Sequence, residues 1–236
     1  MANDEKELRL LPIVTGVFVT VLILTPPLDS KFIAVGRFAV PGATLIFPLA
    51  FILNDVLTEV YGFERSRRVI WTGLACQVLA ALSFWLVGRL PGAVFWHNDE
   101  AYGVILGIAP RIAVASLLAY LCGEFANSLV LSRMKFTQRG RTGLPQGLRF
   151  VVSTIAGEAL DSVVFMSVGF AGVLSSRDLL ETTVAIYLIK VGYEVLALPL
   201  STRLANWMKR REAFDKLDDP LATAYNPFRF AVTRGE

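Results

Sequence analysis

The chain has 236 residues, of which 54% are hydrophobic and 18% charged, and it carries a formal net charge of +3. High hydrophobicity with low net charge excludes an intrinsically disordered protein. The two cysteines, Cys76 and Cys122, lie in apolar runs and exclude a secreted disulfide scaffold. A membrane-crossing helix needs about 20 apolar residues, so six of them would occupy just over half of the chain. The composition therefore predicts a polytopic membrane protein.

Six apolar runs follow one another along the chain, and each is long enough for a transmembrane helix. The least clear connection lies between the first two, at residues 29–38. We expect an all-α fold with six transmembrane helices within residues 1–210. The polar residues 211–236 are too few to bury a core and are predicted to form a cytoplasmic tail. The predicted spans are about 9–28, 39–61, 69–90, 104–131, 149–172 and 180–206.

Lysine and arginine residues are distributed unevenly between alternate connections. Sixteen lie at the N-terminus, in the second-to-third and fourth-to-fifth connections and in the tail, whereas four lie in the other connections. Because cytoplasmic loops carry the excess of basic residues, both termini are predicted to be cytoplasmic. The sixteen are Lys6, Arg9, Arg65, Arg67, Arg68, Arg133, Lys135, Arg139, Arg141, Arg149, Lys209, Arg210, Arg211, Lys216, Arg229 and Arg234, and the four are Lys31, Arg37, Arg89 and Arg177.

Eight ionisable residues fall inside the predicted spans, six acids and two bases. An ionisable side chain in hydrocarbon is costly and marks a functional site by default. With only two bases present, the excess acids must be protonated, solvated or bound to donors that a ligand supplies. The eight are Asp55, Glu59, Arg111, Glu124, Glu158, Asp161, Lys190 and Glu194.

Helical spacing places polar residues on one face of the second, fourth, fifth and sixth spans. In hydrocarbon these faces must meet each other or a water-filled cavity, so we predict that they line one binding site. An acidic site favours a cation or a neutral heterocycle rich in N–H donors over a phosphate or carboxylate solute. The candidate binding residues are Asn54, Asp55, Thr58, Glu59, Tyr120, Glu124, Asn127, Thr154, Glu158, Asp161 and Lys190.

Structural interpretations are open for several of these charges. Lys190 and Glu194 are four residues apart and could form an ion pair within one helix. Glu59 lies near the predicted cytoplasmic end and could meet Arg65 or Arg67 as an interfacial ion pair. These alternatives need contacts that the sequence does not supply.

One short pattern occurs twice in the chain, 34 residues apart. Gly-Glu-x-x-Asn-Ser spans residues 123–128 and Gly-Glu-x-x-Asp-Ser spans residues 157–162. Two such short matches can arise by chance in helix-rich sequence, so they do not by themselves predict an inverted repeat.

Enzyme chemistry has little support in the sequence. The single histidine, His97, falls in a predicted outer loop, and Cys and His show no metal-ligand spacing. Tyr120 can be a packing residue with a satisfied hydroxyl, and Arg111 lies off the Glu124 face, where it can pair or reach the membrane surface. We expect no catalytic residue, no metal, no cofactor and no nucleic-acid partner. The oligomeric state has no signal in the sequence.

The run Phe47-Pro-Leu-Ala-Phe-Ile-Leu-Asn-Asp-Val-Leu-Thr-Glu-Val-Tyr-Gly62 resembles the signature of the queuosine precursor transporters, also called the putative vitamin uptake transporter family. The resemblance extends over residues 30–228, and the first span is similar only in hydropathy. Some relatives carry Gln and Asp where this chain has Glu124 and Asn127. The other matching segments are 65–71, 111–128, 149–162, Lys190 and 225–228.

This resemblance implies a six-span importer of the bacterial inner membrane whose substrate is a nucleobase-like precursor for tRNA modification, 7-cyano-7-deazaguanine or its 7-aminomethyl relative. On this hypothesis Glu158, Asp161 and Glu124 accept N–H bonds from the guanine-like edge. The remaining expected roles are amide contacts from Asn127 and Asn54, a cytoplasmic exit shaped by Asp55 and Thr58, and charge balance by Lys190.

Two other functions are compatible with six such spans. One is a substrate-capture subunit of an energy-coupling-factor vitamin importer, which needs separate ATPase and scaffold partners. The other is a non-transporting membrane protein whose buried charges only fix helix pairing.

Overall fold

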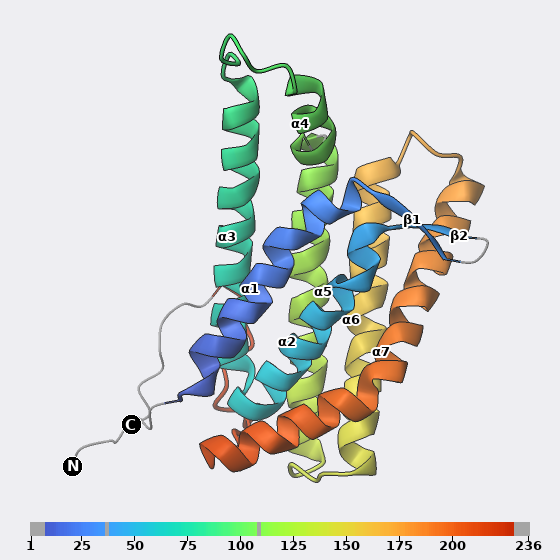
Figure 1. The fold of residues 1–236 in the computed structure, drawn as a ribbon. Helices are drawn as coiled ribbons and strands as arrows, with labels where there is room; N and C mark the ends of the chain where they lie inside the picture. Colours follow the sequence, from blue (N-terminus) through green and yellow to red (C-terminus); the bar gives the residue numbers. More distant parts are fainter. Residues whose placement is uncertain (1–7, 36–37, 108–109, 229–236) are drawn as a thin grey trace.

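The computed structural model describes residues 8–35, 38–107 and 110–228 (Figure 1). Within them the chain is a bundle of helices with one small β-hairpin. In chain order the elements are α1 (Leu10–Asp29), β1 (Phe32–Val35), β2 (Phe38–Pro41), the 3-10 helix η1 (Gly42–Leu45), α2 (Phe47–Tyr61), α3 (Phe63–Arg89), α4 (Asp99–Leu106), α5 (Pro110–Thr137), α6 (Leu144–Phe170) and α7 (Ser176–Glu212).

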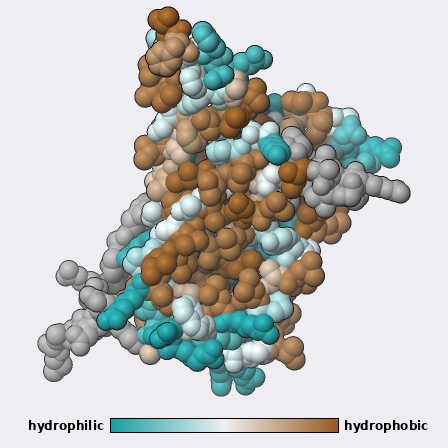
Figure 2. Space-filling view, viewed as in Figure 1, coloured by the Kyte–Doolittle hydropathy of each residue, from teal (hydrophilic) through white to brown (hydrophobic). Residues whose placement is uncertain are grey.

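Five stretches of the described chain are long and apolar enough to cross a membrane, which confirms the helical membrane class. Figure 2 shows apolar side chains over the middle of the visible face and hydrophilic ones along its lower edge, where the last turns of α7 run. This banding is the surface expected of a protein surrounded by lipid. The five stretches are Leu10–Leu28, Phe63–Arg89, Asp99–Thr137, Leu144–Phe170 and Ser176–Glu212; the third takes in α4, α5 and residues 108–109, which lie outside the described residues.

The prediction of one continuous helix over residues 39–61 is wrong. Residues 38–41 form β2, which pairs antiparallel with β1, and a 3-10 turn follows before α2 begins at Phe47. Pro41 cannot donate within a helix, and Gly42 passes so close to α1 that a Cβ there would lie 2.6 Å from the Leu28 carbonyl oxygen. The remaining 15-residue helix is about 22 Å long, shorter than a bilayer core.

Helix α2 forms the centre of the bundle. Thirteen of its fifteen residues are buried, and it contacts α1, α3, α5 and α7. Helix α5 packs most extensively against α6, and the six residues 138–143 that join the two helices make them antiparallel neighbours (Figure 1). Helix α7 changes direction along its length, and Pro199 lies inside it, where the missing N–H weakens the helical ladder. Four helices, α2, α5, α6 and α7, therefore converge on one region.

Several helix ends lie beyond the predicted boundaries. Helix α6 begins at Leu144, so Arg149 is a helical residue with no exposed surface rather than a loop charge. Helix α7 continues to Glu212, which places the basic run 209–211 in its last turn. Of the basic residues counted for orientation, Lys6, Arg37, Arg229 and Arg234 lie outside the described residues.

Residues 213–228, the C-terminal strap, pack against the ends of α2, α3 and α5. The Asp218 carboxylate accepts bonds from the Phe63 backbone N–H and the Ser132 hydroxyl, both at 2.7 Å. Trp71 donates its indole N–H to the Pro227 carbonyl at 2.8 Å. Gly62 has a φ of +82°, and a Cβ there would lie 2.7 Å from an Asp218 oxygen, so this junction requires glycine. The C-terminal strap is thus held against the helices by hydrogen bonds to α3 and α5.

Candidate functional site

Helices α5 and α6 approach closely at the two copies of the repeated pattern. A Cβ on Gly123 would lie 2.9 Å from the Cβ of Asp161, and one on Gly157 would lie 2.8 Å from the Cβ of Asn127. Small residues permit such close backbone approach between membrane helices. The glutamate that follows each glycine, Glu124 or Glu158, is thereby carried into the region between the helices, and both are buried.

Lys190 of α7 lies across from the acids of α6. Its ammonium forms ion pairs with Asp161 and with Glu158, the latter at 3.0 Å from the Oε2 atom. The same ammonium stands 4.5 Å and 5.8 Å from the ring centres of Phe47 and Phe51. These contacts join α7 to α6 and α2, so Lys190 pairs between helices. Sequence reasoning did not identify the two phenylalanines, although they begin the recognised signature.

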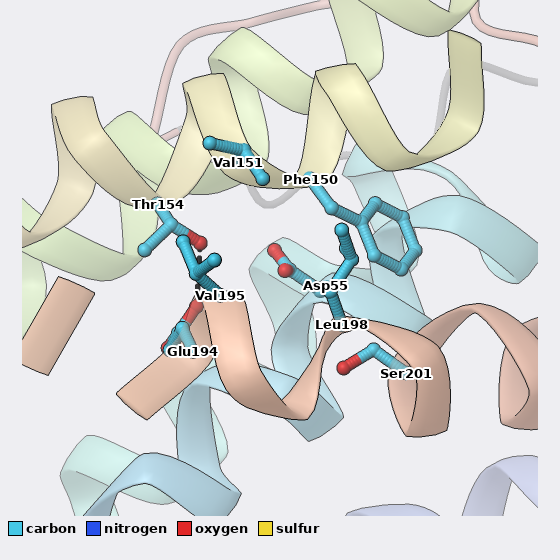
Figure 3. A pocket seen from close by; sticks show the side chains of 8 residues that line it. All are labelled: Asp55, Phe150, Val151, Thr154, Glu194, Val195, Leu198 and Ser201. Atoms are coloured by element: carbon cyan, nitrogen blue, oxygen red, sulfur yellow. Dashed lines mark hydrogen bonds between the residues drawn. The ribbon is translucent and has the colours of Figure 1, made fainter. Parts of the chain in front are cut away.

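Two further acids of this region are Glu194, which follows Lys190 by four residues on α7, and Asp55 on α2. The Thr154 hydroxyl donates to Glu194 Oε2 at 2.5 Å, and the Asn127 amide donates to Asp55 Oδ1 at 2.6 Å. Asp55, Thr154 and Glu194 line a cavity between α2, α6 and α7 (Figure 3), and the volume of this cavity is about 10 Å³. That space holds about one water molecule, so the site is closed in this conformation. The cavity is completed by Phe150, Val151, Val195, Leu198 and Ser201.

Glu124 has no hydrogen-bond partner for either carboxylate oxygen within the described part of the chain, although the residue is fully buried. Asn127 Oδ1 and Glu194 Oε1 are also buried without a partner there. A buried acceptor left without a donor costs about 1–3 kcal/mol, so such atoms need an explanation. The region offers acceptor oxygens to N–H or O–H donors that the described residues do not supply.

Three predicted site residues are engaged in contacts that hold the helices together. Asn54 donates to the Ser128 hydroxyl at 3.1 Å, and Thr58 donates to the same hydroxyl at 3.0 Å, joining α2 to α5. Tyr120 donates to the Ile70 carbonyl at 2.9 Å, joining α5 to α3. Tyr120 is therefore a buried packing residue whose hydroxyl has a hydrogen-bond partner, one of the two roles considered for it from the sequence.

Glu59 lies one helical turn from Asp55 on α2, at the centre of a separate buried ion-pair network. Arg149 donates to both of its oxygens, with a distance of 2.7 Å from Nε to Oε2, and Lys209 approaches Oε1 at 2.6 Å. We expected Arg65 or Arg67 as partners, and the ion pairs come from α6 and α7. Sequence reasoning missed this role of Arg149 because it assigned the residue to a loop.

Arg111 lies at the opposite end of α5 from Lys135. It donates to the Val168 carbonyl at 2.7 Å and to the Ala171 carbonyl at 2.6 Å. These carbonyls belong to the end of α6, where backbone acceptors lack helical partners and favour a cation. Arg111 therefore stabilises the α6 terminus. Among residues 8–35, 38–107 and 110–228, no three His, Cys, Asp or Glu side chains form a group that could hold a metal ion.

Comparison with known proteins gives one family. The family described as "Putative vitamin uptake transporter" matches residues 41–204. The chain is 28% identical over 159 residues to the "Probable queuosine precursor transporter" of Bacillus subtilis (strain 168), covering 66% of this chain and 67% of that protein. It is 25% identical over 171 residues to the "Queuosine precursor transporter" of Escherichia coli (strain K12), covering 71% and 73%. No solved structure matches the chain.

Proposed function

Because the chain belongs to the putative vitamin uptake transporter family, we propose that it imports a queuosine precursor for tRNA modification, either 7-cyano-7-deazaguanine or 7-aminomethyl-7-deazaguanine. The chain is a multi-pass membrane protein, which in bacteria belongs to the inner membrane. The names of its relatives support the substrate class. The observation that carries the proposal is the group of buried carboxylates at the meeting point of four helices, with acceptor oxygens still open.

The hydrogen-bond donors of a deazaguanine are complementary to these open acceptor oxygens. A guanine-type ring presents a ring N–H beside an exocyclic amine, and one carboxylate can accept both bonds in parallel. We assign this contact to Glu124, whose two oxygens are open, with Glu158 and Asp161 as further acceptors beside Lys190. Asn127 would add an amide contact through its open Oδ1, next to Asp55.

In this proposal the other predicted site residues hold the helices around the binding site in place. Asn54, Thr58 and Tyr120 hold α5 against α2 and α3, and Glu59 holds the ends of α6 and α7. Thr154 orients Glu194 at the cavity. Because the cavity has room for about one water, substrate entry requires α7 to move away from α2 and α6.

For the membrane topology, we propose that α2 and its hairpin count as the second of six membrane-embedded segments. Residues 1–210 would then form the transmembrane domain, with both termini on the cytoplasmic side and residues 211–236 as a cytoplasmic tail. Fusion of an alkaline phosphatase or a fluorescent protein to the C-terminus tests this orientation. Fluorescence without phosphatase activity supports it, and phosphatase activity contradicts it.

Ligand-dependent thermal stability tests the substrate proposal. A ligand that binds only the folded state at 100 times its Kd stabilises that state by about 2.7 kcal/mol. The purified protein in detergent is titrated with both deazaguanines, guanine and biotin. A rise in melting temperature with a deazaguanine and none with biotin supports the proposal. A rise with biotin alone favours the vitamin-capture subunit, and no rise with either deazaguanine contradicts the proposal.

A further inference from the structure

Glu124 differs from the other buried acids of this region because its carboxyl group has neither a hydrogen-bond partner nor an ion-pair partner within the described chain. Glu158 and Asp161 are ion-paired with Lys190, Asp55 accepts from Asn127, and Glu194 accepts from Thr154. Glu124 has no exposed surface, and neither of its oxygens has a partner.

Helices α2, α6 and α7 each bring at least one acid toward Glu124. Asp55 comes from α2, Glu158 and Asp161 from α6, and Glu194 from α7, while Tyr120 lies one turn away on α5 itself. The base of this region, Lys190, is held between Glu158 and Asp161. The Glu124 carboxyl is thus buried among four other acids.

An ionised carboxylate without a partner in such a place is strongly disfavoured, whereas a protonated carboxyl is neutral. We propose that Glu124 is a proton-binding site, and that its proton is released when the N–H groups of the substrate bind to the carboxylate. The second half of this proposal rests on the proposed function. On substrate binding, the O–H bond of Glu124 breaks, the proton passes to water, and the two oxygens accept the ring N–H and the exocyclic amine. Proton and substrate therefore compete for one group, and each transport cycle exchanges one for the other.

Infrared spectroscopy of the substrate-free protein tests the proton site directly. A protonated carboxyl group has a C=O stretching band that a carboxylate lacks. We expect this band at neutral pH in the wild type and a loss of the intensity of one carboxyl group in Glu124→Gln. Glu181→Gln is the matched control, because Glu181 is exposed and paired with Arg177, and its band intensity is expected to equal that of the wild type. An unchanged band in Glu124→Gln would overturn the proposal.

A second measurement uses the wild type alone and does not depend on the folding of a variant. The purified protein in weakly buffered detergent is mixed with 7-cyano-7-deazaguanine in the presence of a pH indicator. We expect release of about one proton per bound molecule and an affinity that rises up to about tenfold per pH unit in the range where Glu124 titrates. Saturating binding without proton release would overturn the exchange. Failure of any precursor to bind would contradict the proposed function, while the infrared band would still decide the proton site.

Discussion

Gly157 of α6 lies against Asn127 of α5, so closely that a Cβ on Gly157 would come 2.8 Å from the Cβ of Asn127. The contact has a counterpart at Gly123, which lies against Asp161 with a corresponding distance of 2.9 Å. The glycine of each copy of the repeated pattern thus faces the Asn or Asp of the other copy. In two antiparallel helices this is a local two-fold relationship, and it sets the position of Glu124 beside the acids of α6.

Replacing Gly157 with alanine is expected to destabilise the α5–α6 pair. The added methyl group meets a Cβ and the Gly123 carbonyl oxygen at 2.9 Å, neither of which can move freely. Overpacking of this kind costs about 1–3 kcal/mol, measurable as a lower melting temperature in detergent. Gly192→Ala is the control, because no atom lies within 4 Å of a Cβ at that helical position. Equal melting temperatures for the two variants would contradict the close approach.

Glu59→Gln is expected to be strongly destabilising through its effect on Arg149. Both side chains are fully buried, and removal of one partner from a buried ion pair costs about 3–5 kcal/mol. Asp215→Asn removes the acidic partner that Lys135 and Lys209 share, but Asp215 is 44% exposed and solvent screens its charge. Its loss is expected to cost about 0–1 kcal/mol. A Glu59→Gln protein that melts like the wild type would show that Glu59 has no such structural role.

Exchanging the charges of Lys190 and Glu194 distinguishes pairing within α7 from pairing between helices. In the structure Lys190 contacts Asp161 and Glu158, whereas Glu194 contacts Thr154. The double variant Lys190→Glu with Glu194→Lys places a third acid beside two others, and its lysine is displaced from them by about one helical turn. We expect it to be at least as destabilised as Lys190→Glu alone. Recovery to the wild-type melting temperature would indicate an ion pair within α7.

Asp218→Ala is expected to loosen the C-terminal strap from α3. Asp218 accepts from the first backbone N–H of α3 and from Ser132, and loss of an acceptor at a helix N-terminus costs about 0.5–2 kcal/mol. Asp219→Ala is the neighbouring control, because exposed Asp219 caps only the strap's own turn through Leu221. Faster proteolysis after Glu212 in Asp218→Ala than in Asp219→Ala would be the measured sign. Equal cleavage rates would contradict the strap contact.

The sequence was sufficient to predict which residues gather between the helices. Glu124, Glu158, Asp161 and Lys190 are polar positions at helical spacing in otherwise apolar runs, and hydrocarbon leaves such side chains only the bundle interior. The long apolar helices followed from the same argument.

Other features depend on contacts between distant segments, which periodicity does not contain. Helix α6 begins five residues earlier than hydropathy indicates, so Arg149 lies inside the helix, where it forms a buried ion pair with Glu59. Hydropathy does not contain this boundary, because it depends on packing between helices. Residues 39–53 carry no charged side chain and run across β2, the 3-10 turn and the start of α2, so hydropathy alone could not separate β2 from α2. The strap binds through Asp218 and through backbone carbonyls, neither of which gives a hydrophobic signal.

Uptake of radiolabelled 7-cyano-7-deazaguanine into liposomes that contain only this chain tests whether the protein by itself transports a queuosine precursor. We expect saturable uptake that the unlabelled aminomethyl analogue reduces and biotin does not. We expect loss of that uptake in the double variant Glu158→Gln with Asp161→Asn, with normal uptake in Glu181→Gln. Absence of uptake by the folded wild type, or undiminished uptake by the double variant, would contradict these expectations.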